Sequence, residues 1–284
     1  MRRIHLFEWA DQPWLPTLFR DFITDHLRYA SEKLKLFQPI CPKLYESLRA
    51  LGETRVVDLC SGAGGPLPAL LLELERSFDS RPQVVLTDRY PNRRAFARIE
   101  EQYGGFAGYS GRGGRISCRN EPTSASDVPL ALSGFRTLFG ALHHFRPPEA
   151  TRILADAVDK RVGIAAFEVQ ERSLVSLFNG VLFAFLSSFL LTPRVGRLTA
   201  ARALLTYLLP LAPLIFMWDG VVSCLRTYSP SELDELTRDL RIDGYSWDIG
   251  RLRVPGVFTG YSITYLIGMP TPSEGSGANA PSMV

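Results

Sequence analysis

Residues 56–65 read VVDLCSGAGG, a short apolar run that ends in an acid and continues into a glycine-rich turn. Pro66 and several leucines follow, which is typical of a helix that begins directly after the turn. Such a strand–turn–helix unit lets a ligand approach the backbone, because glycine has no Cβ and tolerates positive φ. Open α/β sheets bind ligands beyond the carboxyl ends of their strands, so this unit predicts the place of a binding site.

Two common glycine motifs do not fit this turn. A phosphate-binding P-loop needs Gly-Lys followed by Ser or Thr, whereas Gly65 precedes a proline. A dinucleotide-binding turn needs a third glycine at the position that Leu67 occupies. Residues 83–88, QVVLTD, read as a second strand, and its final acid, Asp88, is well placed to bind two ribose hydroxyls. The two acids and the glycine turn together indicate an adenosine-type ligand without phosphates.

Three segments resemble class I S-adenosylmethionine-dependent methyltransferases. Residues 58–64, DLCSGAG, resemble the family's first motif, usually written (D/E)xGxGxG. Residues 124–129 resemble its third-strand motif, and residues 138–145, LFGALHHF, its fourth strand and the turn that follows. The resemblance extends roughly from residue 55 to 171. It implies an α/β fold with a Rossmann-like seven-stranded sheet and helices on both faces, with S-adenosylmethionine as the cofactor and methyl transfer as the activity.

The resemblance also implies which residues bind the cofactor. Asp88 matches the ribose-binding acid of the family. Two positions depart from the pattern: Cys60 replaces the first glycine, which is tolerable if its φ is ordinary, and Ser124 replaces the usual adenine-contacting Asp, with Asp127 three residues later. The expected cofactor-binding residues are Asp58, Ser61, Gly62, Gly64, Asp88, Arg89, Ser124, Ala125 and Gly140.

His143 and His144 are the catalytic candidates. They follow the expected fourth strand, whose carboxyl end should face the transferred methyl group. Histidine is the side chain best suited to proton transfer near neutral pH. The alternative is a structural turn in which one of the two histidines binds a backbone carbonyl.

The candidate substrate residues are Glu168, Trp218, Asp219 and Tyr228. Glu168 lies near the end of the expected fifth strand, where it either binds substrate or pairs with an arginine such as Arg172. The other three precede a late helix, close to where similar enzymes place substrate residues. Their structural alternatives are an ion pair between Asp219 and Arg226, and a core position for Tyr228.

Composition narrows the possible partners. The chain has 284 residues and a formal net charge of +3, which gives no indication of a nucleic-acid surface. Its four cysteines have no CxxC or other metal-ligand spacing, so no metal site is predicted, and they fit a reducing compartment. No signal peptide is recognisable after the first methionine. These features predict a cytoplasmic protein with no nucleic-acid partner, and the resemblance to methyltransferases implies a small-molecule methyl acceptor.

The chain divides into five segments. Residues 1–52 are predicted to be a helical cover or lid, 53–173 the cofactor-binding α/β core, and 174–228 an apolar helical insertion after the fifth strand. Residues 229–270 supply the last part of the core, with a capping box at Ser229 and two closing strands. Residues 104–114 are a predicted flexible loop, and 271–284 a disordered tail.

The insertion is the unusual part of the sequence. Residues 174–191 carry no charge over eighteen positions, the lower limit for a bilayer-spanning helix. Residues 203–218 continue this character but contain Pro210 and Pro213, which kink helices. Three hypotheses remain open: a buried helical pair that forms an apolar substrate chamber, an interfacial or re-entrant membrane dock, and a spanning hairpin. The arginine-bearing loop between the segments opposes the last of these.

The leading functional hypothesis is methyl transfer to a small apolar or amphipathic acceptor, in the cytoplasm or at the surface of a membrane contacted through residues 174–218. The alternative is a membrane-docked binding or scaffold protein with a degenerate methyltransferase fold, which the replacements at Cys60 and Ser124 motivate. A DNA cytosine methyltransferase is disfavoured, because the chain has no Pro-Cys nucleophile dipeptide after the glycine turn.

Overall fold

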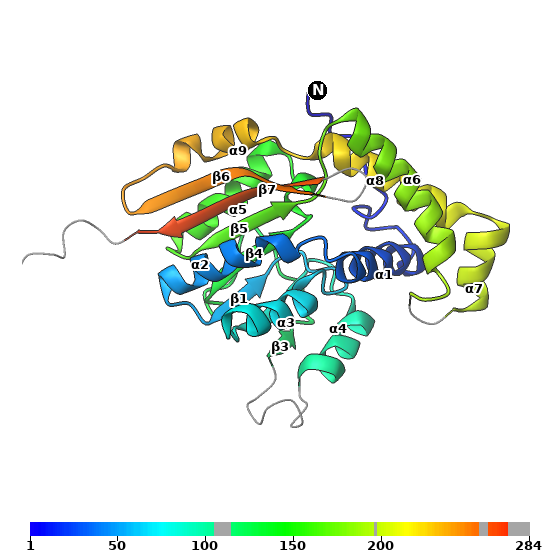
Figure 1. The fold of residues 1–284 in the computed structure, drawn as a ribbon, viewed down its shortest axis with the longest axis horizontal. Coiled ribbons are helices and arrows are strands. Elements are labelled where there is room, and N and C mark those ends of the chain that lie inside the picture. Colours follow the sequence, from blue (N-terminus) through cyan, green and yellow to red (C-terminus); the bar gives the residue numbers. More distant parts are fainter. Residues whose placement is uncertain (105–114, 196–197, 256–260, 272–284) are drawn as a thin grey trace, which may run out of the picture.

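The chain folds around a seven-stranded sheet with the strand order β3-β2-β1-β4-β5-β7-β6, which confirms the expected fold class (Figure 1). The computed structural model describes residues 1–104, 115–195, 198–255 and 261–271. The strands are β1 Arg55–Asp58, β2 Gln83–Leu86, β3 Ile116–Cys118, β4 Phe135–Phe139, β5 Ile164–Glu168, β6 Tyr245–Val254 and β7 Tyr261–Pro270. The predicted loop at 104–114 and tail at 271–284 lie almost entirely outside the described residues.

The position of β1 in the sheet fixes where a ligand can bind. β1 pairs in parallel with β2 on one side and with β4 on the other, so that Asp58 is level with both Leu86 and Thr137. The connections therefore run in opposite directions from β1, which leaves a crevice at the carboxyl ends of these strands. β7 is antiparallel to both β5 and β6, as expected for the two closing strands.

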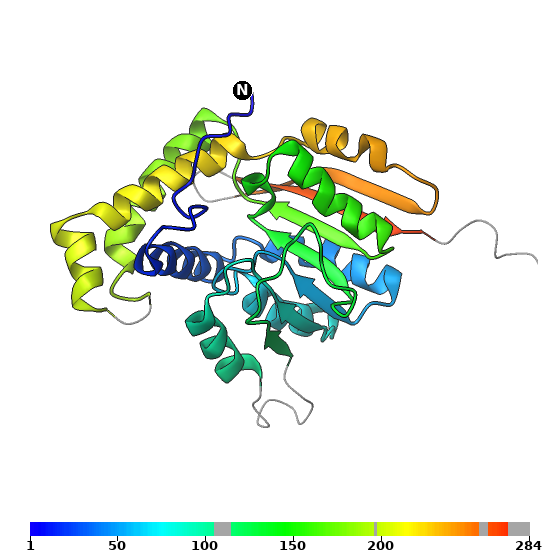
Figure 2. The same cartoon turned by 180° about the vertical axis from the view of Figure 1, so that it is seen from behind.

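Helices cover both faces of the sheet (Figures 1 and 2). One face carries α2 Cys41–Leu51, α3 Leu67–Phe78 and α4 Arg93–Ile99, whose buried leucines and phenylalanines pack on β1 and β2. The other face carries α5 Pro147–Asp159 and α9 Pro230–Thr237. The capping box predicted at Ser229 is present: its hydroxyl accepts from the Glu232 amide, and Glu232 accepts from the Ser229 amide.

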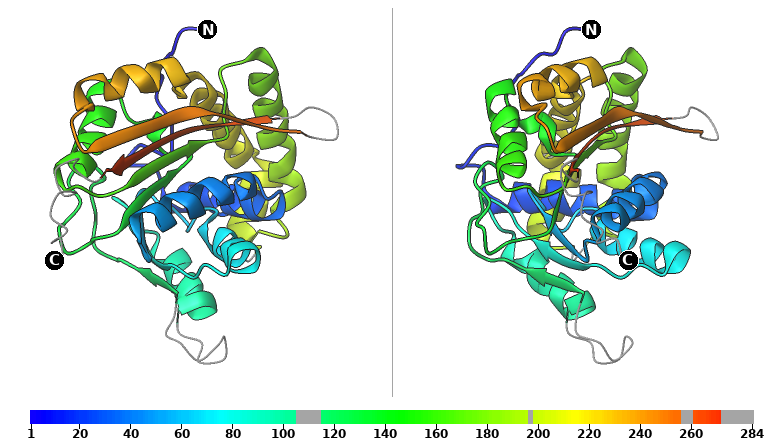
Figure 3. Two further views of the ribbon diagram at one scale, coloured as in Figure 1. Left: turned by 60° about the vertical axis from the view of Figure 1, so that its left-hand side comes forward. Right: turned by 90° about the vertical axis from the view of Figure 1, so that its left-hand side faces the viewer.

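The insertion and the first helix form a separate group at one end of the sheet. The insertion comprises α6 Leu174–Leu191, α7 Ala200–Ala203 with the π-helix Leu204–Leu208, and α8 Leu211–Arg226. Together with α1 Thr17–Lys33 it encloses a small third core around Phe22 and Phe216. Figures 2 and 3 show that this group lies beyond the carboxyl ends of β4 and β5.

Two polar contacts fasten the insertion to α1. The Asp25 carboxylate pairs with Arg202 at 2.5 Å, and both side chains are buried. The ring of His26 contacts the Thr192 hydroxyl at 3.2 Å through Nε2. The N-terminal segment is thus packed against the insertion as well as against the sheet, as a helical cover requires.

The outward side of α6 is apolar and exposed. Leu174, Phe178, Leu182, Leu186 and Leu190 recur at every fourth position and are each exposed by 46 % or more. By length and composition α6 could cross a membrane, and the bent pair formed by residues 200–208 and 211–226 passes the same test. Only 18 % of α6 is buried, so the apolar residues of this helix mostly face outward, which favours the hypothesis of a membrane dock over that of a buried helical pair.

Candidate functional site

The glycine turn after β1 is bonded to both neighbouring strands. The Leu59 amide donates to the Thr137 carbonyl in the middle of β4, and the Ser61 amide donates to the Thr87 carbonyl after β2, both at 2.9 Å. The Gly62 amide then donates to Asp88 Oδ2 at 2.8 Å. The acid expected to bind ribose therefore lies directly at the turn.

The backbone φ angle of Cys60 is not the ordinary negative value that would make a cysteine tolerable at this position. Its φ is 59°, in the left-handed region that glycine adopts without strain. The cause lies in its neighbours, because Leu59 bonds toward β4 and Ser61 toward β2, so the backbone has to change direction at the residue between them. A side chain in this conformation costs about 1–2 kcal/mol, which explains why the family motif has glycine here.

Gly64 is the glycine of the turn with the least room. Its φ is 96°, and a Cβ there would lie 2.3 Å from Ile99 Cδ1 of α4. Replacing Gly64 with alanine is therefore expected to combine backbone strain with overpacking, and to lower the free energy of unfolding by about 2–4 kcal/mol. Urea denaturation of the purified variant measures this change.

Gly65→Ala is the matched control for this prediction. Its φ of 52° is also positive, but nothing lies within 4 Å of the added Cβ. We expect this variant to lower the free energy of unfolding by only about 1 kcal/mol, from the strain of a side chain at positive φ. Equal losses for the two variants would show that the contact between Gly64 and Ile99 is unimportant.

Asp58 is a buried acid at the end of β1. Its Oδ1 accepts from the Thr137 hydroxyl at 2.7 Å, and the residue is 2 % exposed. Burial raises the pKa of Asp58 to about 7; the nearby Ser61 and Thr137 hydroxyls oppose this rise, and the negative charge of Asp88 adds to it. A cationic ligand group beside Asp58 would favour its charged form.

The raised pKa predicts a pH-dependent stability. The folded state holds a proton on Asp58 up to about pH 7, whereas an exposed Asp loses it near pH 3.8. The folded state thus binds more protons between these values, and stability falls as pH rises through this window. Asp58→Asn should remove this fall and stabilise the chain at pH 8 by up to about 4 kcal/mol.

Urea denaturation of wild type and Asp58→Asn at pH 5 and pH 8 tests this prediction. Asp127→Asn, a change at an exposed acid, is the control. Parallel pH profiles of stability for wild type and Asp58→Asn would contradict the raised pKa of Asp58.

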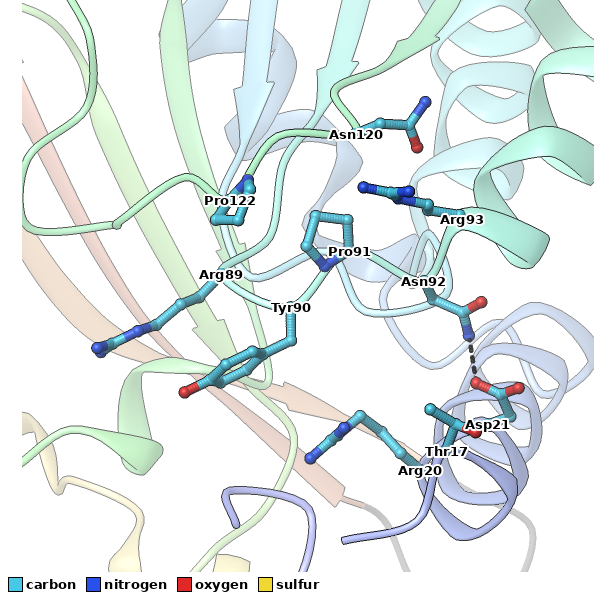
Figure 4. A pocket seen from close by; sticks show the side chains of 10 residues that line it. All are labelled: Thr17, Arg20, Asp21, Arg89, Tyr90, Pro91, Asn92, Arg93, Asn120 and Pro122. Carbon is cyan, nitrogen blue, oxygen red and sulfur yellow. Dashed lines mark hydrogen bonds between the residues drawn. The ribbon is translucent and has the colours of Figure 1, made fainter. Parts of the chain in front are cut away.

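A pocket of about 280 Å³ opens beyond β2 and β3 (Figure 4). Its lining includes Arg89, which the sequence predicts, together with Tyr90 and Asn120, which it does not. These two were missed because the family motifs end at Asp88 and begin again at Ser124; their position directly after strands β2 and β3 was the available signal. Ser124 itself is exposed and its hydroxyl contacts Ser126, while Ala125 is buried.

The two histidines lie in a short 3₁₀ helix, Leu142–His144, directly after β4 and Gly140. His143 is 1 % exposed, and Glu168 holds it twice: the His143 amide donates to Oε1 at 3.1 Å, and Nδ1 donates to Oε2 at 2.8 Å. The predicted ion pair between Glu168 and Arg172 is wrong, because Arg172 pairs with Glu232 instead. β5 ends beside β4 in the sheet, so Glu168 reaches the histidine before it reaches Arg172.

The segment before α1 covers the histidine pair with two acids that the sequence did not indicate. His144 Nδ1 lies 2.8 Å from Asp11 Oδ1 and 3.1 Å from Glu8 Oε2. Burial lowers the pKa of His144, but Glu8 and Asp11 outweigh it, and the pKa is raised to about 9. For Asp11, burial is outweighed by His144 and Arg226, and its pKa lies well below the ordinary value.

Two of the predicted substrate residues hold this N-terminal segment. Asp219 accepts hydrogen bonds from the backbone amides of Trp9 and Ala10 at 2.7 and 3.0 Å, and burial raises its pKa to about 7. The Trp218 indole donates to the Phe7 carbonyl. The expected ion pair between Asp219 and Arg226 is therefore wrong, since Arg226 pairs with Asp11 and Glu8.

Arg226 and Tyr228 complete this region. Arg226 is 2 % exposed and pairs with Asp11 at 2.6 Å and Glu8 at 3.4 Å. Tyr228 is buried, and its hydroxyl donates to the Phe145 carbonyl, so it occupies the expected core position. The predicted residues form two groups: the cofactor set around β1, β2 and β4, and a charged cluster around His143. Ser124 and Ala125 belong with the first group, because the Thr123 amide donates to the Asp88 carbonyl at 2.9 Å and Ala125 packs in the same core cluster as Val57 and Leu138.

Comparisons with known proteins agree with the fold. No family model matches the chain, and no curated protein matches its sequence. Among solved structures, the plantazolicin methyltransferase BpumL in complex with SAH has a TM-score of 0.55 at 9 % identity, covering 92 % of each chain. The methyltransferase domain of bacterial CtHen1 has a TM-score of 0.48 at 14 % identity, over 82 % of this chain and 99 % of that domain.

Human N-acetylserotonin methyltransferase in complex with SAM has a TM-score of 0.44 at 14 % identity, over 82 % of this chain and 52 % of that one. Such low identities speak for the fold alone. The strand order and the match to BpumL define the fold as that of class I S-adenosylmethionine-dependent methyltransferases.

Proposed function

We propose that this chain is an S-adenosylmethionine-dependent methyltransferase that acts on an apolar or amphipathic small molecule at a membrane surface, peripheral to the membrane on its cytoplasmic side. The observation that carries the proposal is the position of α8. Its buried residues Asp219 and Arg226 contact the segment over the histidine pair, while Leu211, Leu214 and Trp218 on the same helix are exposed. One helix thus joins an apolar surface to the edge of the sheet that carries the cofactor residues.

The cofactor part of the proposal is supported by the turn after β1. Gly62 and Gly65 leave room beside its backbone, Asp88 reaches it through the Gly62 amide, and the Asp58 carboxylate lies behind it. These residues fit a ligand with a ribose diol and cationic groups. S-adenosylmethionine supplies a methyl group on a sulfonium, so the protein has to align the acceptor and exclude water. The intact turn disfavours the alternative of a scaffold with a degenerate cofactor site.

The acceptor part rests on the histidine pair and the apolar surface. His143 and His144 follow β4 and Gly140, at the edge where the cofactor residues converge, and we assign them to the acceptor atom that is methylated. Glu168 fixes the ring of His143. An acceptor that approaches along α8 would meet apolar side chains first and these histidines last.

A surface dock fits the insertion better than a spanning hairpin. α8 carries buried charged residues that bind the N-terminal segment, and α1 holds α7 through the ion pair of Asp25 and Arg202. A helix fastened in this way cannot leave the domain to cross a bilayer without exposing those charges to lipid. The exposed stripe of α6, with the exposed Tyr207 whose ring contacts Phe189 of the same helix, has the composition of an interfacial surface.

Cofactor binding provides the first test. Asp88→Ala is expected to weaken the affinity for S-adenosylmethionine by about 10- to 100-fold, because it removes an acceptor for the ribose hydroxyls, with a charged hydrogen bond contributing about 1.5–3 kcal/mol. Isothermal titration calorimetry measures this affinity. Asp127→Ala is the control, since Asp127 is an exposed acid near the same edge whose partner is Lys160 at 3.6 Å. Absence of binding to the folded wild type would refute the proposed function.

A further inference from the structure

A buried nitrogen in the charged cluster has no partner. A carboxylate only accepts hydrogen bonds, so the Nδ1 of His143 carries the hydrogen that Glu168 Oε2 receives at 2.8 Å. Nε2 is then an acceptor, and it is buried without a hydrogen-bond partner among the described residues. Glu8 Oε1, which is another acceptor, lies 3.9 Å from it. This oxygen also accepts from the Ser223 hydroxyl at 3.2 Å and lies 3.4 Å from Arg226 Nη1. Two buried acceptors that face each other indicate a cation between them.

A third ligand atom lies beside them. His144 Nδ1 is 3.1 Å from Glu8 Oε2, and one ligand atom from each of Glu8, His143 and His144 falls within 4.8 Å of the others. The same nitrogen is 2.8 Å from Asp11 Oδ1, so an ion that binds it displaces the hydrogen shared with Asp11. Ligands about 2.1 Å from a tetrahedral metal ion lie about 3.4 Å apart. The distance from His143 Nε2 to Glu8 Oε1 is 3.9 Å and that from His144 Nδ1 to Glu8 Oε2 is 3.1 Å, so the two oxygens of this carboxylate lie at distances on either side of this value. We propose that Glu8, His143 and His144 bind a divalent first-row transition-metal ion.

The surroundings match such an ion. Glu168 on Nδ1 of His143 is the outer carboxylate that orients a metal-binding histidine. The charged groups that face the cluster are Asp11, Glu168, Arg226 and Glu8 itself, while Asp219 is occupied by two backbone amides. Three carboxylates and one guanidinium leave a net charge of −2 when the imidazoles are neutral, which a divalent ion balances. Two imidazoles and one carboxylate are ligands that suit Zn²⁺ and its neighbours.

The site lies beside the proposed acceptor position, at the carboxyl end of β4. It therefore specifies how the two histidines act in the proposed function: they hold an ion that would polarise the acceptor. The binding site itself stands on the geometry of Glu8, His143 and His144 alone. If the chain binds the ion but not S-adenosylmethionine, the metal site is supported and the proposed function fails. If it binds S-adenosylmethionine but no ion, the metal site fails and the proposed function stands.

Metal titration of the full chain tests the site. After removal of adventitious metal with a chelator, Co²⁺ is added while its visible absorption is recorded, and Zn²⁺ is added in a calorimeter. We expect one ion per chain, a Co²⁺ spectrum of low coordination number, and Zn²⁺ affinity at least tenfold weaker in Glu8→Gln and in His143→Gln. Glu168→Gln, a positioning variant, should weaken it by about 10- to 100-fold.

The control is His5→Gln, which removes a histidine of the same N-terminal segment whose ring contacts Arg3. It should bind Zn²⁺ like the wild type. Thermal unfolding shows which variants are folded, and Zn²⁺ should raise the Tm of the wild type and of His5→Gln but leave that of Glu8→Gln unchanged. A folded wild type without bound Co²⁺ or Zn²⁺, or equal Zn²⁺ affinity in Glu8→Gln, would overturn the proposal and leave a water or a proton in this place.

Discussion

Replacement of Arg226 by methionine is expected to lower the free energy of unfolding by about 3–5 kcal/mol, because it leaves buried carboxylates without their counter-charge. Arg226 pairs with Asp11 and Glu8 and donates to the Leu6 carbonyl through Nε at 2.7 Å. Methionine keeps most of the aliphatic volume, so the loss reports on charge and hydrogen bonding. Chemical denaturation at neutral pH measures it.

Arg238→Met provides the comparison. Arg238 is exposed by 69 % and lies 3.9 Å from Glu235, so its loss should change stability by less than about 0.5 kcal/mol. The N-terminal segment should also become accessible to protease in Arg226→Met, since this residue and Asp219 hold it to α8. A loss below 1 kcal/mol with an unchanged digestion pattern would mean that the segment is held by its apolar contacts.

Introducing glutamates at Phe178 and Leu190 is expected to reduce the affinity for zwitterionic lipid vesicles by about 100-fold or more. These side chains are exposed by 67 % and 66 % on the outward side of α6. Each replacement removes about 1.5–3 kcal/mol of apolar transfer free energy and adds the cost of bringing a charge to the interface. Every 1.4 kcal/mol corresponds to a tenfold change in affinity. Co-sedimentation with vesicles gives the bound fraction.

Leu130→Glu is the matched control, because Leu130 is exposed by 79 % but lies outside the insertion. It should bind vesicles like the wild type. If the wild type stays in the supernatant and instead forms a dimer that Phe178→Glu and Leu190→Glu abolish, the apolar surface is an interface between two copies. If it does neither, the membrane part of the proposed function is wrong.

The fold and the cofactor turn could be predicted because their signals are local. The run of apolar residues, the acid and the glycines follow one another within residues 55–65, and residues 83–88 repeat the apolar run with an acid at its end. The conformation of Cys60 could not be read in the same way. It depends on hydrogen bonds to Thr137 and Thr87, which come from two other strands.

The charged cluster could be predicted only in part. The sequence indicated His143 and His144, but Glu8 is 135 positions before the first of them and has no motif around it. Only the packing of the first residues across α8 brings this carboxylate to the histidines. Glu168 likewise pairs with His143 and not with Arg172 because β5 lies beside β4 in the sheet.

The aromatic residues near the apolar surface make the chain its own optical reporter. Three of the four tryptophans belong to one cluster: Trp9 packs on Trp14 and Phe7, and Phe7 packs on Trp218. Trp14 is 65 % exposed, and the fourth, Trp247, lies against Gly268 in the sheet. Emission from the cluster should shift to shorter wavelength when lipid replaces water, while Trp247 supplies a constant background. Contact with a bilayer can thus be followed in real time without a label.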